Sequence, residues 1–253
     1  MNAETITSRQ NPLMTHLRKL ASSRSYRKKS GEYLCDGTKL LAEALKWGAE
    51  VKTAVFSEGI DIPPLPDGVR TVRVSEELMC SVSPMETPQG ALFTVALPEV
   101  QLPETLSGKH YLVLDGVQDP GNVGTILRTA DAFDCDGVFL VNACADLYNP
   151  KTARATMGAI FRREAYSVTV EELFSLLQKS GVPLYGTALR DDTVPLAEAN
   201  LARAAVAIGS EGRGLSQQVL DECAKTLKIP MNPRCESLNA AIAATVVLWE
   251  MYR

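Results

Sequence analysis

The stretch "YLVLDGVQDPGNVGTILRTADAF", residues 111–133, joins a continuous apolar run to a helical pattern through an Asp-Pro-Gly turn. A short apolar run that ends at turn residues is typical of a strand buried in a parallel sheet. The alternation continues along the chain, with apolar runs at 137–141, 182–188, 204–210 and 226–231 and helical patterns at 171–180 and 215–224. We therefore predict an α/β fold with a mainly parallel sheet and helices on both faces. Ligand sites of such sheets lie where the strands end.

The part of the chain before residue 98 has a different pattern. It predicts helices at about 11–22 and 38–47 and strands at about 32–35, 51–56, 70–74 and 91–97. The stretch "PEVQLPETLSGKH" follows, where proline and glycine interrupt a polar segment without a clear period. We predict a small α/β domain at 1–98, a linker at 99–108 and the larger domain at 109–253.

Composition bounds the class of protein. The chain has 253 residues, of which 45% are hydrophobic and 22% charged, values typical of a soluble globular protein rather than a disordered one. It has no apolar run of about 18 residues, as a membrane span needs, and its first residues lack the apolar core of a signal peptide. We therefore expect a cytoplasmic protein. Six cysteines without a C-x-x-C pair predict reduced, buried thiols and no metal site: Cys35, Cys80, Cys135, Cys144, Cys223 and Cys235.

One basic segment stands out although the net charge is -4, which argues against indiscriminate coating of nucleic acid. The segment "HLRKLASSRSYRKKS", residues 16–30, contains no acidic residue. It is either a solvated helix face and loop or a surface that neutralises the phosphates of a structured RNA. Its cations are Arg18, Lys19, Arg24, Arg27, Lys28 and Lys29.

The turn within residues 111–133 carries the first set of candidate polar groups. Asn122 is a good N-cap for the helix that follows, and Gly124 leaves space near the first turn. Helical side chains lean toward the N-terminus, so Arg128 can lie over Gly124 and bring a cation to the end of the strand. The alternative is that Arg128 pairs with a surface carboxylate such as Asp131.

The second candidate loop is "AIGSEGRGLS", residues 207–216, with three glycines around Glu211 and Arg213. Glycines allow positive φ and close approach of the backbone to a ligand. The loop lacks the lysine of a P-loop, and no G-x-G-x-x-G follows the strand at 111–117. Binding of a nucleoside triphosphate and a nicotinamide-dependent oxidoreductase are therefore poorly supported.

The third is the C-terminal stretch "IPMNPRCESLNAAIAATVVLWEMYR", residues 229–253. Ser237 can cap a helix that begins near Leu238 or Asn239. This helix is apolar on nearly every side, so the core, a partner chain or both must cover it.

Taken in this order, the three motifs and the segment "RATMGAIFR" at 154–162 resemble the SpoU (TrmH-type) RNA 2′-O-ribose methyltransferases of the SPOUT superfamily. The N-terminal part is similar to the small RNA substrate-binding domain that many members carry. The resemblance implies S-adenosylmethionine as the methyl donor, a C-terminal trefoil knot, and a homodimer that forms through the knotted region. Neither histidine, His16 nor His110, lies in a motif.

The resemblance also implies site residues. Those that match the catalytic motifs are Asn122, Arg128, Glu211, Ser237 and Asn239. Those around the cofactor are Thr187, Ala188, Leu189, Gly209, Ser210, Glu211, Gly212, Ile229, Met231 and Leu238. Those expected to contact RNA are Arg18, Arg24, Arg27, Lys28, Lys29, Arg154 and Arg162, with Arg190 as a further contact. Because a guanidinium stays protonated, we expect Arg128 to orient the ribose and stabilise the developing alkoxide rather than to act as a base.

The predicted function is S-adenosylmethionine-dependent methylation of a ribose 2′-OH in structured RNA, with ribosomal RNA favoured. One alternative is a transfer RNA ribose methyltransferase. Another is a non-catalytic RNA-binding or ribosome-assembly factor on the same fold. Such a factor would be expected to have lost the polar quartet of Arg128, Glu211, Ser237 and Asn239, which this chain retains.

Overall fold

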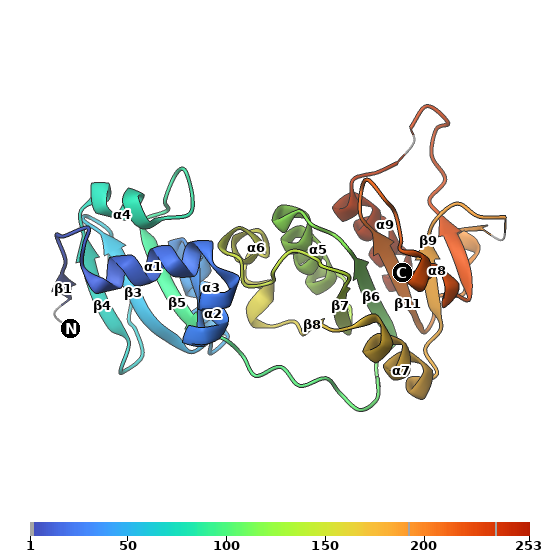
Figure 1. Ribbon diagram of the computed structural model, residues 1–253, viewed down its shortest axis with the longest axis horizontal. Helices are drawn as coiled ribbons and strands as arrows, with labels where there is room; N and C mark the ends of the chain where they lie inside the picture. Colours follow the sequence, from blue (N-terminus) through green and yellow to red (C-terminus); the bar gives the residue numbers. More distant parts are fainter. Residues whose placement is uncertain (1–2, 192, 236) are drawn as a thin grey trace. The chain divides into compact units, whose positions relative to one another are not determined.

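The computed structural model describes residues 3–191, 193–235 and 237–253. The chain forms two compact units, labelled by element in Figure 1. The first comprises Met1–Glu99 and Asp146–Arg162, and the second comprises Val100–Ala145 and Arg163–Arg253. The chain first passes from one unit to the other after Glu99, at the start of the predicted linker. The segment Asp146–Arg162, which the sequence placed within the larger domain, packs with the first unit instead.

The second unit is built on a seven-stranded sheet in the order β10-β12-β9-β11-β6-β7-β8. All of its strand pairs are parallel, which confirms the predicted sheet type. The strands are β6 (His110–Asp115), β7 (Gly137–Val141), β8 (Ala165–Ser167), β9 (Leu184–Thr187), β10 (Val194–Pro195), β11 (Ala204–Gly209) and β12 (Lys225–Lys228).

Helices cover both faces of this sheet, as predicted (Figure 1). Alternate strand residues such as Tyr111 and Val113 pack in one apolar cluster with α7 (Val170–Ser180) and Val219 of α8 (Gln217–Asp221). Their neighbours Leu112 and Leu114 are equally buried and point to the opposite face. The helices on that face are α5 (Pro120–Ala132) and α9 (Ala240–Tyr252), which contact each other.

Helix α9 is the alanine-rich segment for which the sequence predicted a buried helix. Its inner side is buried, with Ala244 and Val247 fully covered. Its outer side exposes about half of Ile242, Trp249 and Tyr252. The core of this unit therefore covers the helix only in part.

The first unit has a five-stranded mixed sheet in the order β1-β4-β3-β5-β2. Strand β5 runs antiparallel to both of its neighbours, while the other pairs are parallel. The elements of its first part are β1 (Glu4–Thr5), α1 (Pro12–Ser22), α2 (Arg24–Ser30), β2 (Glu32–Asp36), α3 (Thr38–Lys46), β3 (Val51–Ser57), β4 (Arg70–Val74), α4 (Glu76–Val82) and β5 (Ala91–Ala96). The helices α2 and α4 are short and were not predicted.

The two faces of this sheet are covered differently. Helices α1 and α4 pack on one face. Helix α3 covers the other together with the segment Asp146–Arg162, which contains α6 (Pro150–Ala155) and a short 3-10 turn, η1 (Ala159–Phe161). Ala153 of α6 is fully buried in that second cluster, and Phe161 packs against it. The late segment thus completes the core of the first unit.

The exposure of the cysteines differs in part from the prediction. All six cysteines are free, but Cys80 and Cys235 are exposed, so the prediction of buried thiols is wrong for these two. Cys80 lies on the outer side of α4, and Cys235 lies in the loop between β12 and α9.

No helix in the described part of the chain is both long and apolar enough to cross a membrane. The trefoil knot stays a prediction.

Candidate functional site

A pocket of about 310 Å³ lies in the second unit where β9, β11 and β12 end, beside the start of α9. Nine of the ten residues expected around the cofactor line it: Thr187, Ala188, Leu189, Gly209, Ser210, Glu211, Ile229, Met231 and Leu238. Gly212 is not among the lining residues, whereas Gly214 is. The three parallel strands bring these loops to one edge of the sheet, as expected of open α/β sheets.

The loop after β11 is folded tightly on itself. Ser210 and Gly214 exchange two backbone hydrogen bonds, of 3.1 and 2.9 Å. A Cβ atom on Gly209 would lie 2.2 Å from the carbonyl carbon of Gly214, so only glycine fits there. Gly214 itself has φ +66°, in the left-handed region. The backbone of this loop therefore forms one wall of the pocket and carries Glu211 at its tip.

Three predicted catalytic residues are joined by hydrogen bonds. The Asn122 side-chain amide donates to a carboxylate oxygen of Glu211. Asn122 Oδ1 accepts from Asn239 Nδ2 at 3.1 Å. Asn239 Oδ1 in turn accepts from the backbone N–H groups of Ala241 and Ile242. The first turn of α5, the loop after β11 and the N-cap of α9 are thus joined by one chain of hydrogen bonds that ends at a carboxylate of the pocket.

The helix caps differ from the sequence prediction at both helices that flank this chain. Asp119, not Asn122, caps α5, because Pro120 occupies the first helical position, where proline is favoured. Asn239, not Ser237, caps α9. Each change has a consequence for the site. The side chain of Asn122 is available to bind Glu211, and Ser237 is available to line the pocket.

Arg128 lies on the exposed side of α5 and is not one of the pocket-lining residues. It makes no hydrogen bond or ion pair with any residue that the structure describes. The alternative partner, Asp131, accepts a 2.7 Å hydrogen bond from Arg163 instead. Arg128 is therefore a solvated cation on the helix that carries Asn122.

Sequence reasoning missed a buried carboxylate that holds the loops in place. Asp115 is the last residue of β6 and is almost fully buried. Its two oxygens accept hydrogen bonds from Asn142 Nδ2, at 2.8 Å, and from the backbone N–H of Ser216, at 2.6 Å. Asn142 has φ +53° and also donates to the Ser216 hydroxyl. An aspartate at the end of the apolar run "YLVLD" was the available signal.

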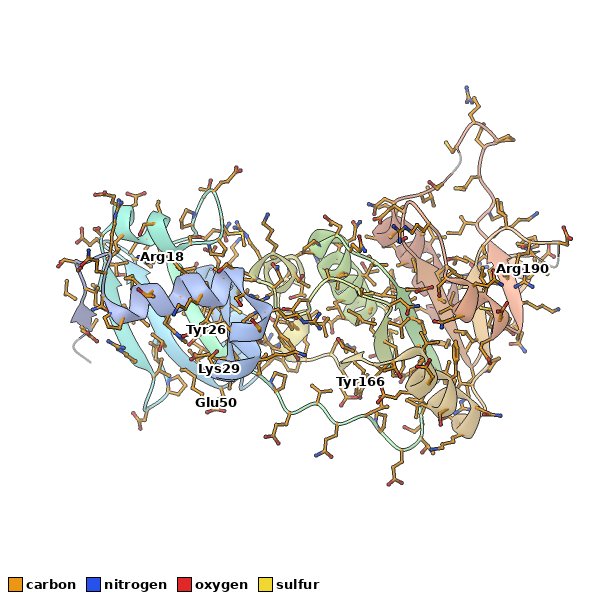
Figure 2. The ribbon with its side chains drawn as sticks, in the orientation of Figure 1. Arg18, Tyr26, Lys29, Glu50, Tyr166 and Arg190 are labelled. Atoms are coloured by element: carbon orange, nitrogen blue, oxygen red, sulfur yellow. The ribbon has the colours of Figure 1, made fainter. Side chains whose placement is uncertain are left out.

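The residues expected to contact RNA lie in the first unit, apart from Arg190. Figure 2 shows Arg18, Tyr26 and Lys29 on α1 and α2. Arg24, Lys28 and Lys29 are exposed. Arg190 follows β9 in the second unit, where it donates a 3.1 Å hydrogen bond to the backbone oxygen of Leu220.

Arg27 does not fit the predicted role. It is only 3% exposed, and its guanidinium donates to Asp146 at 2.6 Å and to the Leu20 carbonyl at 2.5 Å. It thereby joins α2 to the segment Asp146–Arg162 within the first unit. Arg27 is therefore a structural residue, and it cannot present its charge to RNA.

Comparison with known proteins defines the class. Residues 109–249 match the SpoU rRNA Methylase family, and residues 11–92 match the MRM3-like substrate binding domain. The structure is similar to that of an AdoMet-bound rRNA methyltransferase from Sinorhizobium meliloti, with a TM-score of 0.86 and 28% identity over 98% of this chain and 97% of that one. The fold is therefore that of the SPOUT methyltransferases. The chain belongs to the SpoU rRNA methylase family.

Two curated relatives extend over nearly the whole chain. A Bacillus subtilis 23S rRNA (guanosine(2553)-2′-O)-methyltransferase is 33% identical over 251 residues, covering 97% of this chain and 98% of the relative. A Streptomyces viridochromogenes 23S rRNA (uridine(2479)-2′-O)-methyltransferase is 30% identical over 266 residues, covering 99% and 92%. The predicted family and the class of RNA 2′-O-methyltransferase are confirmed.

Proposed function

We propose that this chain transfers a methyl group from S-adenosylmethionine to a ribose 2′-OH of ribosomal RNA, with the strand-end pocket of the second unit as the donor site. The observation that carries the proposal is the hydrogen-bonded chain of Asn239, Asn122 and Glu211, in which Glu211 lines that pocket. It links the three loops that match the family's motifs. A ligand in the pocket and an RNA ribose beside it would meet at these groups.

The pocket fits such a donor in size and chemistry. Its volume of about 310 Å³ lies in the range of small-molecule sites, roughly 300–1,000 Å³. Its walls combine strand-end backbone with small or apolar side chains such as Ala188, Ile208 and Ala243. Glu211 is the one carboxylate among the lining residues that the structure describes. When bound, the sulfonium supplies an activated methyl group, so the protein has to align the acceptor hydroxyl and stabilise its oxygen.

The residues of this chain have distinct tasks in that alignment. Asn122 is hydrogen-bonded to both Glu211 and Asn239, so it fixes the positions of the three motifs relative to one another. The site is thereby preorganised before the substrate binds. Ser237 lines the pocket with a hydroxyl that can orient the ribose. Arg128, an exposed cation on α5, approaches the ribose and its phosphate and stabilises the 2′ oxygen while the hydroxyl proton passes to solvent water.

The RNA substrate is proposed from the relatives and from the first unit. Both curated relatives act on 23S rRNA, one at a guanosine and the other at a uridine. Their names therefore favour ribosomal over transfer RNA but do not transfer a target base to this chain. The exposed cations Arg24, Lys28 and Lys29, with Arg18, are proposed to contact RNA phosphates.

A homodimer through α9 and a cytoplasmic location belong to the same proposal. The exposed stripe of Ile242, Trp249 and Tyr252 is apolar and continues through the ring of Phe133, 5.7 Å from each aromatic ring. A second copy of this chain would remove that stripe from water. Sedimentation of the wild type is expected to show a dimer, and Ile242→Glu, which places a charge in the stripe, is expected to show a monomer. A wild type that sediments as a monomer would contradict the dimer.

Two measurements test the function. Calorimetry with clean protein is expected to show S-adenosylmethionine binding, and its absence would refute the donor site. Mapping of ribose methylation across total RNA, in cells with and without this protein, is expected to show the loss of one or a few ribosomal sites. Loss confined to transfer RNA would support the alternative substrate, and an unchanged methylation map would support the non-catalytic alternative.

A further inference from the structure

A second, larger cavity lies in the first unit, on the outer side of α3. Its volume is about 890 Å³, and it is bounded by α3, the end of β2 and the segment Asp146–Arg162. Helix α3 covers the face of the five-stranded sheet opposite to α1. The cavity is therefore on the other face from the cations of α1. Its lining residues include Lys39, Glu43, Arg154, Met157 and Arg162.

An exposed tryptophan continues the same face of α3 beyond the cavity. Lys39, Glu43 and Trp47 follow one another at intervals of four residues, so they lie in one row along the helix. Lys39 and Glu43 line the cavity, and Trp47, at the C-terminal end of α3, is 49% exposed. The row therefore leads from the cavity to a half-exposed indole ring.

Two cations lie over the Trp47 ring. Lys46 Nζ is 5.8 Å from the ring centre, and the guanidinium carbon of Arg162 is 5.6 Å from it. Arg162 also donates a 2.8 Å hydrogen bond to Glu43, which fixes the guanidinium beside the indole. Cations attract the faces of aromatic rings at such distances. An exposed ring among cations is the arrangement with which proteins stack an unpaired base and hold its phosphate.

The cations of this surface have hydrogen-bond donors to spare. Lys39 and Lys46 are exposed and make no hydrogen bond or ion pair with a described residue. Arg154 pairs with the buried Asp36 at 3.6 Å, which is too long for a hydrogen bond. With Arg162, four cations thus face two carboxylates, both of which are already paired. The surface therefore carries an excess of positive charge, which attracts phosphates.

A second large apolar side chain is held on the cavity wall. Met157 has φ +50° and is 49% exposed. Gly158 follows with φ +94°, and an added Cβ would lie 2.8 Å from Glu43 Cβ. The backbone thus passes against α3 at a distance that only glycine permits. This close approach keeps Met157 beside the row of Lys39, Glu43 and Trp47, where its thioether can pack on a base.

We propose that this surface binds an unpaired segment of the RNA substrate, with one base stacked on the Trp47 indole. Lys46, Lys39 and Arg154 hold the neighbouring phosphates. The row from Lys39 to Trp47 spans about 12 Å of helix at about 1.5 Å per residue, long enough for more than one phosphate. Of these residues, only Arg154 was expected from the sequence to contact RNA. The proposal rests on the proposed function, since it takes RNA as the substrate.

Stacking gives the surface a preference for strandedness and not for sequence. Every base has a flat face, so stacking on an aromatic ring tolerates any base. In a duplex, the faces of the bases are already covered by their neighbours. We therefore expect the surface around Trp47 to distinguish unpaired from paired RNA.

Tryptophan fluorescence of the full chain tests the stacking. The probes are unstructured oligouridine and an RNA duplex of the same length. Trp47 and Trp249 are the two tryptophans of the chain, so the signal that is lost in Trp47→Phe belongs to Trp47. We expect oligouridine to quench the fluorescence of the wild type but not that of Trp47→Phe. The duplex should leave both unchanged.

Affinities separate stacking from the attraction of charge. Trp47→Ala is expected to weaken oligouridine binding roughly tenfold, as the stacking of one base implies, and Trp47→Phe should restore most of it. The slope of log affinity against log salt should stay unchanged in Trp47→Ala. Lys39→Gln combined with Lys46→Gln should reduce this slope by about 0.7 for each phosphate no longer neutralised. Lys179→Gln, an exposed cation on α7 in the other unit, is the matched control and should change neither quantity.

The same variants show which result overturns the proposal. Full oligouridine affinity in Trp47→Ala, or equal quenching by the duplex, would overturn it and leave the ring to a protein contact. Urea unfolding checks that each variant is folded, and Trp47→Leu takes the place of Trp47→Ala if the latter is not.

Methyl transfer to ribosomal RNA distinguishes this proposal from the proposed function. A wild type that transfers the methyl group, with an unchanged KM for RNA in Trp47→Ala, would refute the role of this surface alone. A wild type that stacks oligouridine on Trp47 but transfers no methyl group would refute the function and leave the surface standing.

Discussion

Asn239 Nδ2 lies 3.1 Å from Asn122 Oδ1, so the residue that caps α9 also holds the first turn of α5. One side chain performs two tasks with its two ends: the oxygen caps the helix, and the amide joins two motifs. These tasks can be separated by substitution.

Asn239→Asp is expected to keep the cap and lose the link. A carboxylate still accepts from the N–H groups of Ala241 and Ile242, but it has no proton to donate to Asn122. The free energy of unfolding should change little, while methyl transfer to RNA should fall at least tenfold. Asn239→Ala removes both interactions and should also cost about 1 kcal/mol of stability. Urea unfolding and methyl transfer are measured on both variants, and full activity of Asn239→Asp would contradict the role of the link.

Arg128→Ala should abolish methylation without harming the fold. The side chain is exposed and has no partner among the described residues, so the free energy of unfolding should change by less than about 0.5 kcal/mol. Loss of a cation at a developing alkoxide is expected to lower the rate by roughly a hundredfold or more. S-adenosylmethionine affinity should stay unchanged. Arg163→Ala is the matched control: it breaks pairs with Asp131 and Asp134, so it should lower stability and spare catalysis.

Asp115→Asn should loosen the loop that carries Glu211. One of the two donors that now reach Asp115 would face an amide N–H instead of an oxygen. We expect a loss of about 1–3 kcal/mol in stability, with weaker S-adenosylmethionine binding as the loop before Ser216 becomes mobile. Hydrogen exchange at the amides of residues 209–216 reports this directly. Unchanged exchange there would show that the loop does not depend on Asp115.

Neutralisation of the N-terminal cations should divide them into two groups. Replacing Arg24, Lys28 and Lys29 by Gln is expected to weaken RNA binding and to reduce the slope of log affinity against log salt by about 0.9 for each phosphate that is no longer neutralised. Arg27→Gln breaks the buried pair with Asp146 and should destabilise the protein by about 3–5 kcal/mol. An unchanged slope in the first variant would identify these cations as a solvated surface.

Asp36 predicts a pH dependence of stability. Burial raises the pKa of its carboxyl, with Ser83 and Arg154 offsetting part of the rise. The folded protein therefore holds a proton where the unfolded chain has released it, and stability from this group falls as the pH rises from the ordinary carboxyl value of about 4 through the raised pKa. As the pH rises through this interval, the free energy of unfolding of the wild type should fall relative to that of Asp36→Asn. Urea unfolding at several pH values measures the difference, and a constant difference would contradict the raised pKa.

Much of the fold was predictable because it follows from local pattern. Continuous apolar runs between helices indicated a parallel sheet, and the three glycines of residues 207–216 indicated a backbone that can approach a ligand closely. Choices between neighbouring residues were harder to predict. Asp119 and Asn122 are both good caps, and only the position of Pro120 decides which of them serves. The buried states of Arg27 and Asp36 depend on the segment Asp146–Arg162, more than a hundred residues away in sequence, and no local pattern contains that information.

The segment Asp146–Arg162 makes the first unit discontinuous, since the chain enters it, leaves it at Glu99, returns at Asp146 and leaves again at Arg162. During synthesis, the sheet of residues 3–99 has to wait for about fifty more residues before Ala153 and Phe161 can cover its second face. A fragment that stops at residue 98 would expose that apolar face, and a fragment of 109–253 would carry its uncovered complement. No single cut of the chain therefore yields two intact units, and a fragment that contains the first unit whole has to extend to Arg162.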